Sequence, residues 1–184
     1  GSSLRLRSFL PDTREVGRNL IVGAPGWEQQ LLSNKQAFAQ EFAARPSFAA
    51  AYPASLTPAQ FVAALDANTR DPQNPAAGGA LTQAERDGLA AQLAAAGDTL
   101  QARAEVLRAV AENAEFRRRQ SNNAFVLMQY FGYLRRDPND PPDTDYAGHQ
   151  FWLGKLNEFH GDFIRAEMVK AFISADEYRK RFGL

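Results

Sequence analysis

The chain has 184 residues, of which 45% are hydrophobic, and its 21 basic residues balance its 21 acidic ones. This is enough apolar material for a real core, because a domain of this size buries roughly 70% of its unfolded surface. A neutral chain has no global field for nucleic acid or an anionic membrane, and no apolar run approaches the roughly 18 residues of a membrane span. The absence of cysteine excludes disulfides and thiolate chemistry. We therefore expect no nucleic-acid partner and no membrane insertion.

Helix signals recur along the chain from Thr57 onward. Thr57-Pro58-Ala59-Gln60 combines a capping hydroxyl, a proline at the first helical position and a glutamine that completes a capping box. Further boxes are predicted at 82–85 and 174–177, and Ser121-Asn122-Asn123 is predicted to cap a helix that starts near Ala124. Apolar residues recur at helical spacing, whereas alternating β-branched strand patterns are missing. The predicted fold class is therefore all-α.

The chain also contains an internal duplication. Residues 103–120 (RAEVLRAVAENAEFRRRQ) and 165–182 (RAEMVKAFISADEYRKRF) align without gaps, so that Arg103 falls on Arg165. Each copy follows a Phe-Val helix, a proline- and aspartate-bearing loop, a second helix and a glycine turn at Gly97 or Gly161. Such repetition is typical of stacked helical units. We predict one compact, packed multi-helix body made of two tandem related units, 57–120 and 121–184, and a degenerate N-terminal partial copy in 1–56.

Large apolar residues at helical spacing are predicted to form the core. They are Phe42, Phe61, Val110, Phe116, Phe125, Tyr130, Trp152, Phe172 and Tyr178. Apolar positions shared by the two copies, such as Val106 with Met168, are expected to hold the helices together.

The second unit carries the most specific sequence motifs. The residues concerned are Phe125-Val126, Tyr133-Leu134-Arg135-Arg136-Asp137-Pro138, Gly148, Phe151-Trp152-Leu153, Ser174 and Glu177-Tyr178. They resemble a bacterial family called domain of unknown function 4214, closely over 125–183 and weakly over 61–120. Arg135 stands where the family pattern has glycine. The resemblance implies a small helical module of large secreted or cell-surface bacterial proteins, distantly similar to phycobilisome linker domains and without assigned catalytic residues.

The loop DPNDPPDTDYAG is the strongest candidate for chemistry. It holds Asp137, Asn139, Asp140, Asp143 and Asp145 within nine residues, and calcium binds six to eight oxygens of this kind. An EF-hand does not fit, because its glycine and glutamate positions are Pro142 and Gly148. The alternative is a proline-stiffened, solvated loop whose aspartates make local turns. The two histidines, His149 and His160, do not have zinc-site spacing.

These observations favour a non-catalytic helical binding or scaffolding module with a protein or cell-surface partner, and no cofactor apart from a possible calcium ion. A calcium-binding structural domain and a lysozyme-like helical hydrolase are the alternatives. The hydrolase predicts a deep cleft with an acidic residue buried against aromatics. The opening residues carry no signal-peptide pattern, and we expect a fragment of a longer protein whose extracytoplasmic location is implied by the resemblance alone. A specific interaction is expected where the copies differ, between Asp137 and Trp152.

Overall fold

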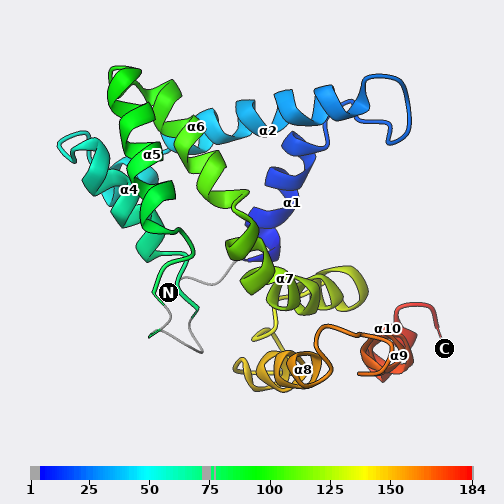
Figure 1. The fold of residues 1–184 in the computed structure, drawn as a ribbon. Helices are drawn as coiled ribbons and strands as arrows, with labels where there is room; N and C mark the ends of the chain where they lie inside the picture. Colours follow the sequence, from blue (N-terminus) through cyan, green and yellow to red (C-terminus); the bar gives the residue numbers. More distant parts are fainter. Residues whose placement is uncertain (1–4, 72–75, 77, 184) are drawn as a thin grey trace. The chain divides into compact units, whose positions relative to one another are not determined.

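The computed structural model describes residues 5–71, 76 and 78–183, and this part of the chain is helical without any strand (Figure 1). The predicted all-α class is confirmed. The elements in chain order are α1 (Leu6–Val16), α2 (Trp27–Ala44), α3 (Pro46–Ala51), α4 (Pro58–Ala67), α5 (Gln83–Ala95), α6 (Leu100–Ala111), α7 (Ala114–Gln129), the π-helix η2 (Tyr130–Leu134), α8 (Ala147–Glu158), α9 (Met168–Ser174) and α10 (Asp176–Lys180).

The chain divides into two compact units. Unit 1 comprises Gly1–Leu10 and Arg119–Leu184, and unit 2 comprises Pro11–Arg118. This division groups α2 and α3 with the helices of the first predicted repeat, and it falls within α1 and α7. That the chain forms one packed body stays a prediction.

Unit 2 is built on two helix pairs, in which α2 packs against α6 and α4 against α5 (Figure 1). The residues that α2 buries are both small, Ala39 and Ala43, and α6 buries Ala102 and Ala104 on its side. Small side chains let two helices approach closely, and the larger groups of the core, among them Phe61 and Leu93, fill the space around this contact.

Two of the three predicted capping boxes are confirmed. The Thr57 hydroxyl accepts a hydrogen bond from the Gln60 N–H at 3.3 Å while the Gln60 side chain accepts one from Thr57, and the box at 82–85 has the same form. The third box is wrong, because Ser174 ends α9 and its hydroxyl donates to the Lys170 carbonyl.

The predicted helix start near Ala124 is also wrong, because α7 runs without a break from Ala114 to Gln129. Its real N-terminal cap is Asn113, whose side-chain oxygen accepts hydrogen bonds from the N–H groups of Glu115 and Phe116. No proline or glycine interrupts the following sequence, so Ser121 and its two asparagine neighbours are carried inside the helix.

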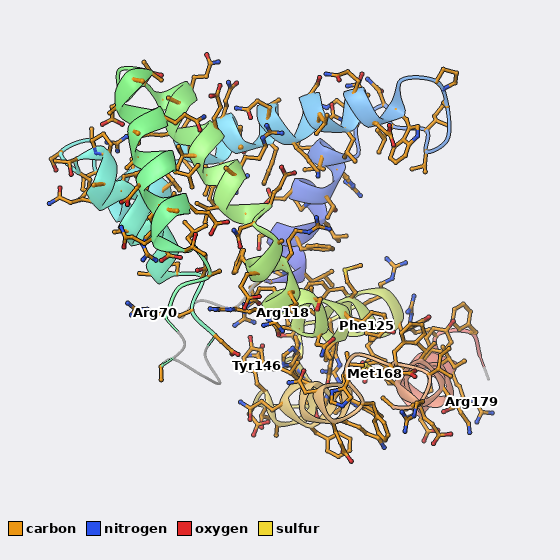
Figure 2. The ribbon with its side chains drawn as sticks, viewed as in Figure 1. Arg70, Arg118, Phe125, Tyr146, Met168 and Arg179 are labelled. Atoms are coloured by element: carbon orange, nitrogen blue, oxygen red, sulfur yellow. The ribbon has the colours of Figure 1, made fainter. Side chains whose placement is uncertain are left out.

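Unit 1 forms a second core from α7, η2, α8 and α9. The buried members are Val126, Tyr130, Phe131, Leu156, Ala166, Met168 and Phe172. Phe125 and Met168, both labelled in Figure 2, mark the α7 and α9 side chains that contribute to it. The π-helix ends at Leu134 and is followed by its C-cap residue Arg135, whose φ of 60° is left-handed. Glycine adopts a left-handed conformation without strain, so the glycine of the family pattern suits the position that Arg135 occupies in this chain.

The duplication is reproduced at the level of burial. Ala104 and Ala166, Val106 and Met168, and Val110 and Phe172 occupy equivalent positions, and each residue is buried in the core of its own unit. The helix break recurs as well, because α7 and α10 begin at the aligned positions Ala114 and Asp176. The shared apolar pattern therefore encodes the packing of both copies.

The copies differ at the start of the duplicated helix. In the first, Thr99 caps α6 and seven positions separate it from Val106. In the second, Asp162 accepts the equivalent backbone hydrogen bond from Arg165, but only six positions separate it from Met168. The missing residue breaks the helix into a turn that closes at Glu167, whose φ is 52°, so α9 begins only at Met168.

The nine predicted core residues fall into three groups. Four are buried, namely Phe61, Val110, Tyr130 and Phe172. Three are half-buried against one of the two cores, namely Phe42, Phe125 and Trp152. Phe116 and Tyr178 are half-buried outside both clusters, and Tyr178 packs on Tyr133 and Phe182 instead.

Candidate functional site

Arg136 organises the acidic loop of unit 1. Its side chain is only 11% exposed, and the guanidinium lies over the Tyr130 ring. It donates hydrogen bonds to the carbonyl oxygens of Asp137, Pro138 and Asp140 and to the carboxylates of Asp143 and Glu177. The planar guanidinium of Arg136 presents five N–H donors in a fixed geometry, which suits several acceptors arranged around it. One cation from the end of η2 therefore ties the loop to α10.

The five predicted calcium ligands also accept hydrogen bonds from the protein. Asp137 is buried and accepts the Leu6 N–H at 2.7 Å, and Arg5 donates to Asn139 at 3.2 Å. Asp140 accepts the Asp137 N–H and Asp145 accepts the Ala147 N–H, while Asp143 accepts from the Arg136 guanidinium. Within the described residues, no group of three His, Cys, Asp or Glu side chains could hold a metal ion. Calcium binding here stays a prediction.

Two titratable side chains lie buried beside this loop. Burial raises the pKa of Tyr130 to about 12. Burial also lowers the pKa of His149, whose ring centroid is 6.4 Å from that of Tyr130 and whose Nε2 has no hydrogen-bond partner in the described chain. The neighbouring Gly148 leaves room for the tyrosine, because a Cβ there would lie 2.7 Å from its hydroxyl oxygen. His149 is therefore held neutral near pH 7.

The buried carboxylates of the described residues are Asp66 and Asp137, and both anchor loops. Asp66 accepts the Leu81 N–H at 2.9 Å and pairs with Arg86 at 2.9 Å, so it fastens the residues that precede α5. Glu158 and Asp162, which flank the 160–161 turn, are both exposed, and Asp162 caps the following turn. The lysozyme-like hydrolase stays an alternative prediction.

A comparison with protein families identifies the second half of the chain. Residues 107–182 match the model of a family described as domain of unknown function (DUF4214). This segment is similar to the DUF4214 family. The match begins within α6 and includes all of α7 to α10, so the resemblance predicted over 125–183 is confirmed. No curated protein and no solved structure matches the chain.

The DUF4214 segment exposes Met128, Phe163 and Ile164, which were not predicted as core or site residues, beside the half-buried Phe125. Phe163 stacks on Phe125 with ring centroids 5.0 Å apart, Met128 lies one turn beyond Phe125 on α7, and Ile164 is 75% exposed. We call these four residues the Phe163 patch. In the sequence, Phe163 and Ile164 are adjacent apolar residues just after the glycine turn at Gly161, but the exposure of their side chains cannot be read from a single sequence.

The described residues of unit 2 form at least three hollows, and these lie outside the interval from Asp137 to Trp152 where an interaction was expected. One of about 540 Å³ lies between α2 and α6, a second of about 410 Å³ lies between α1 and α2, and a third of about 410 Å³ lies between α5 and α6. Phe38 borders the first two. Among the described residues, no helix is both long and apolar enough to cross a membrane.

Proposed function

We propose that the chain is a non-catalytic helical binding or scaffolding module of a larger extracytoplasmic bacterial protein, and that it binds a protein or cell-surface partner through the Phe163 patch. The extracytoplasmic location follows from the family resemblance alone. One observation carries the proposal. In the DUF4214 segment the loop carboxylates and Arg136 accept or donate hydrogen bonds within the fold, whereas Phe163 is 40% exposed and Ile164 is 75% exposed.

The energetics favour this use of the surface. Arg136, Asp137 and Asp143 satisfy one another or nearby backbone groups, so binding a ligand through them would first break internal hydrogen bonds. Covering exposed aromatic and aliphatic side chains has no such cost and releases about 25 cal/mol for each Å² of apolar surface. Contiguous exposed apolar side chains are typical of protein interaction sites.

The proposal can be tested by the binding of the purified, fluorescently labelled chain to intact cells of the bacterium that makes it. The test variant carries Phe163→Ser and Ile164→Ser, and the matched control carries Ile21→Ser and Val22→Ser, another adjacent pair of exposed apolar residues. We expect saturable binding that the test variant weakens at least tenfold and the control leaves unchanged. Equal behaviour of both variants, or the absence of saturable binding, would contradict the proposal.

An activity assay provides the complementary test. The chain is incubated with peptidoglycan and with a peptide library, and we expect no turnover. Hydrolysis that disappears in Asp137→Asn or Asp66→Asn would instead support an enzyme.

A further inference from the structure

The hollow between α2 and α6 is a groove with an apolar floor, which we call the α2/α6 groove. Its apolar lining consists of Val16, Phe38, Ala39, Phe42, Leu107 and Ala111. From Lys35 to Phe42 the groove follows two turns of α2, a length of about 10 Å. Its volume of about 540 Å³ lies within the range of small-molecule sites.

The rim of the groove carries an excess of positive charge. Glu112 accepts from Lys35 at 2.8 Å and lies 3.9 Å from an Arg108 nitrogen. Arg117 is exposed and its guanidinium makes no ion pair with the described part of the chain. Three cations and one carboxylate leave the rim with a net charge of +2, so the groove complements an anion.

Among the residues that line the groove, charged and apolar side chains are separated along α2, while Arg45, outside the lining, lies over the Phe38 and Phe42 rings. The Lys35–Glu112 pair marks one end, and Phe42 lies two helical turns away along α2. A ligand that matches this distribution has one anionic head group and an apolar tail. A docked helix fits less well, because a stable protein interface buries about 800 Å² on each partner and uses anchors over more than two turns.

We propose that the α2/α6 groove binds a lipophilic carboxylate of the fatty-acid class. The carboxylate lies beside Arg117 on the charged rim, and the alkyl chain covers Phe38, Phe42 and Leu107. This site lies in unit 2 and does not rest on the function proposed for the Phe163 patch in unit 1.

The first experiment is calorimetric titration of the full chain with monomeric sodium decanoate. Decyltrimethylammonium, with the same chain length and the opposite charge, is the control. We expect 1:1 binding of decanoate, at least tenfold weaker binding of the cation, and about tenfold weaker binding of octanoate, because two methylenes fewer enter the groove. Equal affinity for the two charges, or binding only to phosphatidylglycerol vesicles, would overturn the proposal.

Variants locate the site. Ala111→Phe fills the groove from the exposed last residue of α6 and is expected to weaken decanoate binding at least tenfold, whereas Ala91→Phe on the exposed side of α5 is the matched control. Arg117→Gln is expected to weaken decanoate about threefold without affecting decyltrimethylammonium. Arg70→Gln, an exposed arginine outside the groove (labelled in Figure 2), is its control.

Amide chemical shifts separate this proposal from the previous one. We expect decanoate to move the signals of Phe38, Leu107 and Ala111. Shifts confined to Phe163 and Ile164 would show adsorption to the patch of unit 1 and would overturn the groove proposal while leaving the patch intact.

Discussion

Glutamine substitution of Arg103 and of its duplicate Arg165 tests whether the two copies use the same residue in the same way. The Arg103 side chain is only 8% exposed, lies over the Phe61 ring and forms two hydrogen bonds to Asp98, at 2.6 and 2.8 Å. The bond to Asp98 raises the pKa of Arg103. Its remaining donors reach the carbonyl oxygens of Tyr52, Pro53, Ala54 and Leu56. Arg165 is exposed and lies over Phe159.

The expected cost follows from these contacts. Hydrogen bonds to a charged group contribute about 1.5–3 kcal/mol each, but their contributions do not add. Asp98 is 27% exposed and the 52–56 segment is at or near the surface, so water replaces part of what is lost. We therefore expect Arg103→Gln to lower the free energy of unfolding by about 3 kcal/mol, at the lower end of the cost of breaking a buried ion pair. Arg165→Gln is expected to cost less than about 0.5 kcal/mol.

The chain offers a direct assay, because Trp27 lies in unit 2 and Trp152 in unit 1, and there are no other tryptophans. The urea unfolding of the Arg103→Gln variant is followed through Trp27, in a chain that also carries Trp152→Phe. The urea unfolding of the Arg165→Gln variant is followed through Trp152, in a chain that also carries Trp27→Phe. For a slope of 1–3 kcal/mol per molar urea, a loss of 3 kcal/mol lowers the midpoint by about 1–3 M. Comparable midpoint shifts for the two variants would refute the reasoning.

Three further outcomes are expected. Because burial lowers the pKa of His149 in the folded state, its contribution to stability is complete above about pH 6.5 and falls as the pH drops toward the folded-state value, by at most about 1.4 kcal/mol per pH unit. His149→Gln should remove this slope and His160→Gln should not. Gly148→Ala should destabilise by about 1–3 kcal/mol because its Cβ meets the buried Tyr130, whereas Gly154→Ala in the same helix should stabilise by up to about 1 kcal/mol. Because the loop carboxylates already accept hydrogen bonds within the fold, calcium at 1 mM should leave the melting temperature unchanged, whereas a site with a Kd near 10 µM would add about 2.7 kcal/mol.

Local signals predicted local structure well. The capping boxes at Thr57 and Thr82 depend on residues three apart, and the all-α class depends on apolar periodicity, so both could be read from the chain. The continuity of α7 through this segment could not be read from the chain, because Asn122 and Asn123 suit a cap or a helix interior depending on what packs around them.

Tertiary features escaped prediction for a different reason. Phe116 and Tyr178 share helical spacing with buried neighbours, but burial depends on whether another helix covers that face. The α2/α6 groove exists because Ala39 and Ala111 are small where their neighbours are large, and that geometry appears only when two distant segments pack together. Contacts between distant segments also decided that Asp137 of the acidic loop is buried, since Arg5 and Leu6 bind it from the start of the chain.

The two loops that follow the Phe-Val helices use different residues for one task. In unit 2 the buried Asp66 and its partner Arg86 hold the backbone at Leu81, and in unit 1 the buried Asp137 accepts the Leu6 N–H while Arg136 holds the loop carbonyls. A carboxylate and an arginine thus fasten each loop. The aspartates that distinguish the second copy therefore serve the fold, and a function specific to either unit has to use surface that this shared fastening leaves free. The Phe163 patch and the α2/α6 groove both meet that condition.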